Sequence, residues 1–300
     1  MALEDHRVTA ERCCRCSYCK FVPYIKQNKR EYETVCPSIA KYSFHGYSCS
    51  GRNIASLALM DDRLEYTDGF LDMVYKCTMD GACDISCKNQ RDMEPFETLL
   101  ALRAKCVEDG ELIPEHMIVI ENLKKEDNMM LAKKADRGKW AEGLDIKNLA
   151  QDQAEVLFHA GCRFSYDEDL WSIIRSGVSL LQRAGVDLGI MGGDETCCGG
   201  RAYKMGYQGE LTKYAEHNTE NWKAHGIKTV VTACSDCYGA FKVLYDKIGL
   251  QPEVEIIHIT HFLIRLIKNG ELKLTREVPL TVTYHDPCNL GRQGEPWIHW

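Results

Sequence analysis

The sequence predicts an α/β protein with a mostly helical N-terminal region followed by a doubly wound α/β domain, and two observations support this. Ten of the sixteen cysteines lie in residues 1–110, none lies in 111–160, and the other six are widely spaced. From residue 153 onward, short strand patterns alternate with amphipathic helix patterns through short links, which is typical of a largely parallel sheet. A chain of 300 residues is long enough for two domains.

The N-terminal region is expected to consist of helices and loops. Apolar residues recur at helical spacing over 53–65 and 94–112, and Gly110 can end the second helix. Residues 121–145 are heavily charged and favour an exposed connector or a surface helix. The parts expected are a ferredoxin-like domain at 1–120, a connector at 121–152, a first α/β domain at 153–280 and the start of a second, truncated one at 281–300.

The C-terminal half carries the strand and helix patterns in turn. Strands are expected over 155–162, 186–191, 228–234, 254–259 and 280–288. Helices are expected over 169–185, 210–226, 238–249 and 260–272. Functional sites of such sheets lie beyond the carboxyl ends of the strands, and cysteines occupy that position after several of these segments.

The composition of the chain argues against several classes of protein. The net charge of −7 and the lack of a basic stripe argue against nucleic acid as a partner. The first residues lack the apolar segment of a signal peptide, and no run of eighteen apolar residues could span a membrane. These features favour the cytoplasm, where disulfides are rare. Sixteen cysteines in that compartment are therefore expected to bind metal or carry redox chemistry rather than form a disulfide framework.

The first cysteine run, "CCRCSYCK", favours an iron–sulfur cluster. Cys13, Cys16 and Cys19 have C-x2-C-x2-C spacing, and Cys36 precedes a proline. Three thiolates on one tight loop suit a four-iron cluster of the ferredoxin type, with a fourth ligand from elsewhere. Sixteen residues separate Cys19 from Cys36, where ferredoxins usually have three. Zinc is the alternative, because C-x2-C also builds zinc knuckles.

The second run, "CTMDGACDISCK", places an acidic residue where a ferredoxin run has a cysteine. Cys77, Cys83 and Cys87 match the run, and Asp80 occupies its second position. In two-cluster ferredoxins the last cysteine of each run serves the other cluster. The first cluster would then use Cys13, Cys16, Cys19 and Cys87. The second would use Cys36, Cys77 and Cys83 with either Asp80 or no protein ligand at the fourth iron. A [3Fe-4S] form is one outcome, and an ordinary turn role for Asp80 is another.

A third group follows the predicted strands and includes two adjacent cysteines in "ETCCGGR". Its members come from three strand ends, and they are Cys162, Cys197, Cys198, Cys234 and Cys237. Five thiolates exceed the four that tetrahedral zinc uses, whereas a polynuclear iron–sulfur centre can use all of them. Gly199 and Gly200 would allow the backbone to approach that cofactor closely.

This five-cysteine pattern resembles the CCG motif of the B and D subunits of heterodisulfide reductase and of related glycolate oxidase subunits. Two N-terminal cluster runs followed by a CCG domain resemble the D subunit in particular, over essentially the whole chain. The resemblance implies that the five cysteines hold a non-cubane [4Fe-4S] cluster or, as in some members, zinc. Among the members, the favoured specific match is the electron-transfer D subunit of class II, tungsten-dependent benzoyl-CoA reductases.

The family normally carries two CCG motifs, and a second one begins here at "YHDPCNLGR". Cys288 opens it, but its adjacent pair and its C-x2-C are absent from the 300 residues. Either the chain is cut short or the second site is lost. Cys49 and Cys106 are expected to be buried thiols without partners, and no chemistry is assigned to Arg52. The chain lacks a dinucleotide-binding fingerprint in the strand–loop–helix context that such a site needs.

Three functions remain open from the sequence. The first is an electron-transfer subunit of an anaerobic oxidoreductase complex, which takes electrons from a flavin-bearing or ferredoxin donor and passes them to a terminal reductase. The second is a catalytic subunit whose CCG centre cleaves a disulfide. The third is a zinc-bound scaffold, which the iron–sulfur spacing of all three cysteine groups disfavours. The sequence identifies no catalytic residue.

Overall fold

The computed structural model describes residues 2–22 and 29–294 and divides into two compact units. The helical unit comprises Met1–Ile113, Ala202–Gln208 and Gly291–Trp300. The sheet unit comprises Pro114–Arg201 and Gly209–Leu290. The chain therefore passes between them more than once.

The helical unit is built from α-helices that pack around a small apolar core. Its helices are α1 (Arg7–Glu11), α2 (Pro37–Tyr42), α3 (Cys49–Met60), α4 (Asp68–Tyr75), α5 (Ala82–Arg91) and α6 (Pro95–Glu108). Short 3-10 turns flank them at η1 (Leu3–His6), η3 (Arg30–Tyr32) and η4 (His45–Tyr47). The core is formed by Leu3, Phe70, Val74, Ala101, Leu102 and Cys106. Cys106 is thus a buried thiol, as expected.

Local sequence explains where helices α3 and α6 begin and where α6 ends. Ser48 caps α3, because its hydroxyl accepts a hydrogen bond from the Gly51 amide at 3.0 Å. Pro95 occupies the first turn of α6, where its missing amide proton costs nothing. Gly110 follows α6 with a φ of +85°, which is the left-handed conformation that stops a helix.

The sheet unit contains five parallel strands in the order β1-β3-β2-β4-β5. The strands are β1 (Lys147–Asn148), β2 (Val156–His159), β3 (Leu188–Ile190), β4 (Thr229–Thr232) and β5 (Glu255–His258). The chain adds β3 on one side of β2 and then crosses to add β4 on the other. Strand order therefore reverses at β2, and ligand sites of open α/β sheets lie at such points.

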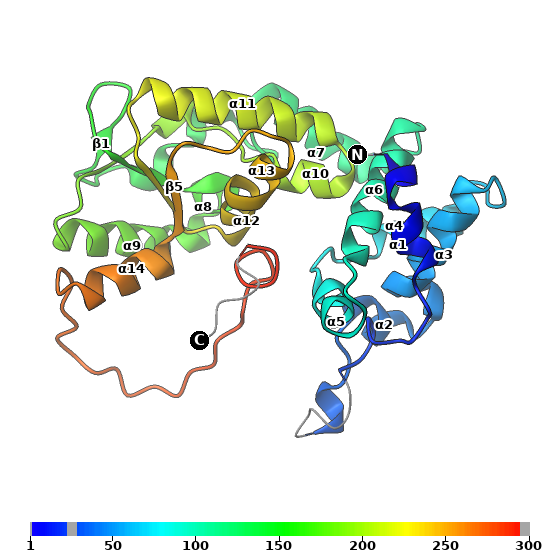
Figure 1. The fold of residues 1–300 in the computed structure, drawn as a ribbon. Helices are drawn as coiled ribbons and strands as arrows, with labels where there is room; N and C mark the ends of the chain where they lie inside the picture. The colour runs from blue at the N-terminus through cyan, green and yellow to red at the C-terminus, as the bar shows by residue number, and fades with distance from the viewer. Residues whose placement is uncertain (1, 23–28, 295–300) are drawn as a thin grey trace. The chain divides into compact units, whose positions relative to one another are not determined.

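Helices cover both faces of this sheet. The helices of the unit are α7 (Pro114–Glu126), α8 (Gly161–Tyr166), α9 (Trp171–Arg183), α11 (Gln208–Ala224), α12 (Ser235–Gly239), α13 (Tyr245–Lys247) and α14 (Ile259–Lys268). A π-helical segment, η9 (Ala240–Leu244), joins α12 to α13, and α10 (Gly200–Met205) leads out of the unit. Further 3-10 turns lie at η5 (Lys134–Asp136), η6 (Lys139–Ala141), η7 (Glu168–Leu170) and η8 (Gly192–Asp194). In Figure 1, α9 and α14 lie on one face of the sheet and α11 lies on the other.

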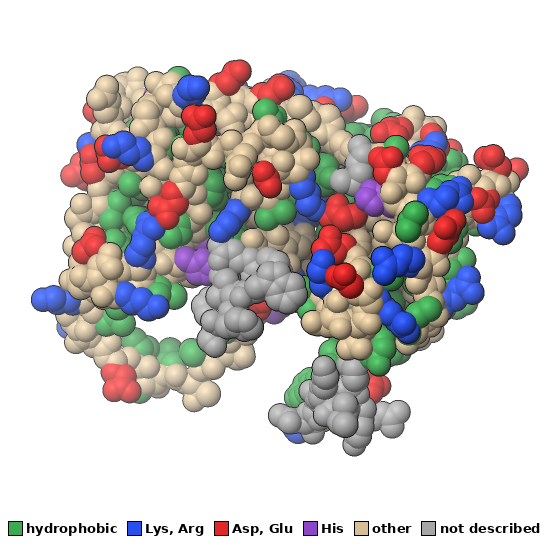
Figure 2. Space-filling view, viewed as in Figure 1, with side chains coloured by type: hydrophobic (Ala, Val, Ile, Leu, Met, Phe, Trp, Pro, Cys, Tyr) green, Lys and Arg blue, Asp and Glu red, His purple; other side chains and the backbone are tan. Residues whose placement is uncertain are grey.

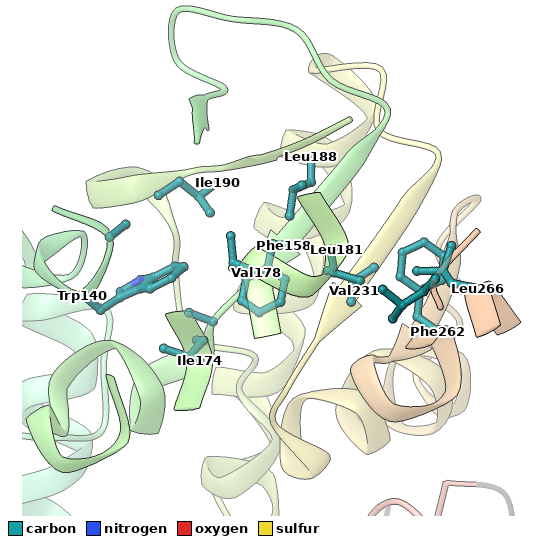
Figure 3. Close-up of a cluster of buried hydrophobic side chains, with 13 residues drawn as sticks. Trp140, Phe158, Ile174, Val178, Leu181, Leu188, Ile190, Val231, Phe262 and Leu266 are labelled. Atoms are coloured by element: carbon teal, nitrogen blue, oxygen red, sulfur yellow. The ribbon is translucent and has the colours of Figure 1, made fainter. Parts of the chain in front are cut away.

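The main core lies between the sheet and the α9–α14 layer. Phe158 and Val231 project from the central strands β2 and β4. Figure 3 shows them among side chains of α9 and α14, including Leu181 and Phe262. Because both faces of the sheet are covered, these strands read in the sequence as continuous apolar runs.

One predicted strand is absent. Residues 280–288 form neither strand nor helix, and Val282 in that stretch is 81% exposed. The alternating apolar pattern is present, but in the described structure no neighbouring strand pairs with this segment. The predicted helix at 238–249 is also interrupted, since its middle turn is π-helical.

The surface carries side chains of both charges and, among the described residues on the face shown in Figure 2, no basic stripe, as the sequence leads us to expect. On the face drawn in Figure 2, Lys and Arg side chains are interspersed with Asp and Glu side chains. Among the residues that the structure describes, no helix is both long and apolar enough to cross a membrane.

Candidate metal centres

The cysteines of the first predicted cluster line one pocket in the helical unit. Cys13, Cys16 and Cys19 come from the loop after α1, and Cys87 comes from α5. We call this the first thiol pocket, and Cys14, Cys49, Ser50 and Asn53 also line it. Arg15 and Ser17 adopt positive φ angles of 59° and 70°, which curl the loop so that all three of its predicted ligands reach the pocket.

A second pocket holds the cysteines of the second predicted cluster. Cys36 precedes α2, Cys77 follows α4, and Cys83 lies in the first turn of α5. We call this the second thiol pocket, and Asp80, Arg52, Cys19 and Cys49 also line it. The sequence therefore grouped the cysteines of each pocket as the fold does, but it offered no role for Cys49.

Burial raises the pKa of several of these thiols and so favours their protonated form in the absence of a cofactor. Burial raises the pKa of Cys19 to about 11 and that of Cys87 to about 12. Burial also raises the pKa of Cys77, although the Arg52 and Arg103 cations oppose the shift. A metal must displace these protons when it binds, so loading is expected to weaken as the pH falls.

A buried arginine beside the second thiol pocket fits an anionic cofactor there. The Arg52 side chain is 1% exposed, and its Nε donates to the Met73 carbonyl at 2.8 Å while Nη1 donates to the Tyr47 carbonyl. Within residues 2–22 and 29–294, its Nη2 is buried and has no hydrogen-bond partner. A buried cation with an unpaired N–H group is costly unless an anion lies nearby, and a thiolate-ligated cluster is such an anion.

Asp80 is held by its own loop. Its Oδ1 accepts a hydrogen bond from the Ala82 amide at 2.9 Å, and its Oδ2 accepts one from the Thr78 hydroxyl at 2.5 Å. Arg292 lies 3.9 Å from Oδ1. Both carboxylate oxygens are therefore engaged in the turn that leads into α5.

The third cysteine group lies at the carboxyl edge of the sheet. The three strands that precede its members, β3, β2 and β4, are direct neighbours. Cys162 lies in the first turn of α8, the pair Cys197 and Cys198 precedes α10, Cys234 is the N-cap of α12, and Cys237 lies within α12. Neighbouring thiols of the group interact with one another in the order 162, 197, 198, 237, 234. The topology thus brings all five predicted residues together.

The thiols of this five-cysteine group differ in acidity. The hydrogen bond to Cys197, together with burial, raises the pKa of Cys162. Hydrogen bonds from Cys197 and Cys237 lower the pKa of Cys198 to about 6, although burial opposes the shift. Cys198 is therefore the thiol that this network best supports as a thiolate, which is the form that binds metal.

Three glycines allow the backbone to pack tightly around the five-cysteine group. Gly199 has a φ of +73°, and its amide donates to the Cys197 sulfur at 3.4 Å. A Cβ atom on Gly200 would lie 2.9 Å from the Cβ of Ala240. Gly161 was not singled out in the sequence, yet with a φ of +75° its Cβ would lie 2.8 Å from the Cys237 sulfur. Only glycine fits these positions without a shift of its neighbours.

Sequence reasoning also missed a buried ion pair beside this group. Arg137, from the stretch expected to be an exposed connector, is 1% exposed and binds Glu195, with Nη2–Oε1 at 3.0 Å. Its Nη2 also lies 3.7 Å from the Cys162 sulfur. Glu195 accepts from the amides of Ala160 and Gly161 at 2.9 and 3.0 Å. The glutamate within "ETCCGG" was the only sequence hint of the pair.

Arg137 keeps its positive charge although its side chain is buried. Burial opposes its charge, but the neighbouring Cys162 and Glu195 raise its pKa overall. Burial would raise the pKa of Glu195, but His159 and Arg137 lower it. Burial lowers the pKa of His159 to about 4, so this histidine is neutral near pH 7. The Arg137 guanidinium thus contacts both the Glu195 carboxylate and the Cys162 sulfur.

The sulfur atoms of each cysteine group are spread apart and do not converge on the position of a single metal ion. Among the described residues, no three His, Cys, Asp or Glu side chains are arranged to hold a single metal ion. The ligands of a four-iron cluster bind separate irons and need not converge on one atom. All sixteen cysteines carry free thiols.

Comparison with known proteins identifies the sheet unit's cysteine group. Residues 156–242 match the CCG family of cysteine-rich domains, and this range includes all five of its cysteines. This part of the chain is a CCG cysteine-rich domain. The three parallel strands that precede the cysteines are therefore the framework of the CCG motif.

Curated relatives extend the similarity beyond the CCG domain. The D subunit of dihydromethanophenazine:CoB–CoM heterodisulfide reductase from Methanosarcina acetivorans is 32% identical over 74% of this chain and 54% of its own length. An EtfAB:quinone oxidoreductase from Syntrophomonas wolfei is 27% identical over 78% of this chain and 33% of its own length. An uncharacterised iron–sulfur protein of Methanococcus maripaludis is 25% identical over 88% of this chain and 51% of its own length.

The similarity to heterodisulfide reductase D subunits shows that the chain is heterodisulfide reductase-like. The chain spans about half the length of the heterodisulfide reductase subunits that it matches. No solved structure matches it.

Proposed function

We propose that this chain is an iron–sulfur electron-transfer subunit of an anaerobic oxidoreductase complex. Two ferredoxin-type clusters in the helical unit would receive electrons, and a cluster in the CCG domain would deliver them to a partner reductase. The observation that carries the proposal is the grouping of cysteine sulfurs, since two thiol pockets and a five-cysteine sheet edge occur in one chain. The relatives, which include iron–sulfur proteins and redox-complex subunits, support the same function.

The residues proposed to hold the clusters follow from these groups. The first thiol pocket would bind a four-iron cluster through Cys13, Cys16, Cys19 and Cys87. The second would bind one through Cys36, Cys77 and Cys83. The five-cysteine group would hold a non-cubane four-iron centre, with zinc as the alternative. Such clusters supply one-electron transfer at potentials set by their charge, hydrogen bonds and solvent exposure.

The protein's own groups would tune and protect these centres. Arg52 and Arg137 place buried positive charge beside the second thiol pocket and beside Cys162. A nearby cation stabilises the reduced, more negative form of a cluster and so raises its potential. The low exposure of Cys197, Cys198 and Cys237 shields these three sulfurs of the CCG group from water.

A catalytic role is the second candidate, and the heterodisulfide reductase relatives favour it, because their enzymes are named for heterodisulfide reduction. In this case the CCG centre itself would reduce a disulfide. The donor would be a flavin-bearing protein or a ferredoxin in either case, and the class II benzoyl-CoA reductases remain our specific candidate for the partner complex.

One pair of assays separates the two candidates. A reductive titration of anaerobically purified protein should consume about three electrons per chain, one for each cluster. With reduced viologen as donor, an electron-transfer subunit should show no sustained oxidation of the dye when a heterodisulfide is added. Sustained, disulfide-dependent oxidation would establish the catalytic role instead. A chain that accepts no electrons would overturn both.

A further inference from the structure

Cys49 lines both thiol pockets, although the cluster motifs leave it unassigned. We propose that Cys49 supplies the fourth thiolate of the second cluster and so completes the ligand set that Asp80 interrupts. The inference rests on the proposed cluster sites, and it adds to them a ligand that lies outside both cysteine runs.

Counting the sulfur donors assigns Cys49 to the second pocket. In the first pocket the three cysteines of the C-x2-C-x2-C run and Cys87 already provide four thiolates, so a further thiolate is superfluous. In the second pocket the runs provide only Cys36, Cys77 and Cys83. Cys19 also reaches this pocket but belongs to the C-x2-C-x2-C loop. Among the cysteines that line the second pocket, Cys49 is the one left unassigned, and this site is one thiolate short.

The contacts of Cys49 agree with the count. Its thiol lies beside Cys83, which belongs to the second set and lines the same pocket. Its side chain is 3% exposed, so its sulfur is directed into the protein rather than toward solvent. The Asn53 side-chain amide donates to the Cys49 sulfur at 3.3 Å, and such hydrogen bonds stabilise a metal-bound thiolate.

The local backbone also favours a thiolate at this position. Cys49 is the first residue of α3, a helix of twelve residues whose N-terminus is capped by Ser48. The positive end of a helix dipole stabilises an anionic sulfur in its first turn. Arg52, one turn further along α3, lines the same pocket and adds a buried positive charge.

Asp80 is the less suitable ligand by comparison. Its two carboxylate oxygens accept hydrogen bonds from Ala82 and Thr78, and binding iron would break at least one of them. Carboxylate is also a harder ligand than thiolate, and iron–sulfur clusters prefer the softer sulfur donor. We therefore assign Asp80 to the turn before α5 and Cys49 to the cluster.

The test compares Cys49→Ala with Asp80→Ala and with Cys106→Ala, which removes a buried thiol from the helical unit's core away from both pockets. Each protein is purified anaerobically, and its iron content and oxidised and reduced electron paramagnetic resonance spectra are recorded. Cys49→Ala should lose about one iron and gain close to one three-iron signal per chain, with the first cluster unchanged. Asp80→Ala and Cys106→Ala should keep the wild-type spectra.

Cys49→Ser covers the case in which the alanine variant does not fold. Serine keeps the size of the side chain but offers a hard oxygen, so the spectrum or potential of the second cluster alone should shift. Wild-type spectra in both Cys49 variants would overturn the inference. A three-iron signal in the wild type, or one produced by Asp80→Ala alone, would also overturn it while leaving the proposed cluster sites intact. A wild-type chain without iron would instead overturn the proposed function.

Discussion

At the scale of single residues, the buried pair of Arg137 and Glu195 is the feature whose removal should cost most. Arg137→Gln leaves the Glu195 carboxylate charged and buried without its cation, which typically costs about 3–5 kcal/mol. Chemical denaturation monitored by circular dichroism measures the loss in the free energy of unfolding. The control is Arg163→Gln, because Arg163 is 62% exposed and pairs with Asp167 at the surface, where the cost should be under about 1 kcal/mol.

A double variant separates the ion pair from simple packing. If the unpaired charge is the cause, adding Glu195→Gln to Arg137→Gln should recover part of the lost stability. Strictly additive losses would contradict the electrostatic account.

His258 should make the protein less stable in mild acid. Its Nε2 donates to the Ala233 carbonyl at 3.1 Å, while its Nδ1 accepts from the Thr260 amide at 3.4 Å, so the ring is neutral as the N-cap of α14. Burial lowers its pKa to about 4, and the nearby His261 adds to this shift. The unfolded value is near 6.5, so between these values the unfolded chain binds more protons, and the free energy of unfolding decreases as the pH falls.

The expected loss between pH 6.5 and pH 4 is roughly 2–3 kcal/mol from this residue. His258→Asn keeps a side-chain acceptor at the N-cap but cannot titrate, so its stability should depend less on pH over this interval. His217→Asn, on the exposed face of α11, serves as the control and should leave the pH dependence unchanged. Equal slopes for wild type and His258→Asn would exclude His258 as the source.

At the scale of elements, the turn between β2 and α8 should be sensitive to any added side chain. Gly161→Ala introduces a Cβ that would lie 2.8 Å from the Cys237 sulfur, in a residue with a φ of +75°. Gly185→Ala, after α9, has a φ of +78° with nothing within 4 Å of its Cβ, so it carries the same backbone strain alone. That strain should cost both variants about 1–2 kcal/mol.

Only Gly161→Ala should also displace a proposed ligand. We expect it to lose iron from the CCG site while Gly185→Ala retains the wild-type content, as measured by iron analysis of protein from parallel anaerobic purifications. Equal iron content in the two variants would show that Cys237 tolerates the shift or is not a ligand.

Most strands and several helices of the sheet unit can be predicted from patterns in the sequence. The strands at β2 to β5 and the helices α9, α11 and α14 follow from apolar runs and periodicity, because both faces of the sheet are buried. β1 was missed because two residues carry no pattern. Residues 280–288 have a strand pattern without a strand, because pairing depends on a partner that local sequence does not encode.

The same limit applies to the candidate sites. Spacing within a run groups Cys13, Cys16 and Cys19, because local geometry decides which side chains share a loop. Arg52, Arg137 and Cys49 reach their pockets through tertiary packing, and nothing in their neighbouring residues distinguishes them from ordinary helix or loop positions. The glycine at 161 looked like part of a strand end until its φ was known.

At the scale of the whole molecule, we propose that one chain carries three iron–sulfur centres in two units. The five cysteines of the CCG domain belong to a different unit from the two thiol pockets, so damage to the CCG group should leave the clusters of the helical unit loaded. Cys198→Ser should therefore remove or alter the CCG centre while the two clusters of the helical unit remain, since a hydroxyl is a poor substitute for a soft thiolate.

Metal analysis of the anaerobically purified wild-type chain tests this claim most directly. Iron, zinc and acid-labile sulfide should be measured on the same sample. We expect a brown protein with about twelve irons per chain. About eight irons with one zinc would instead place zinc in the CCG site and contradict the third iron–sulfur centre. Stoichiometric zinc with little iron and no labile sulfide would contradict all three centres.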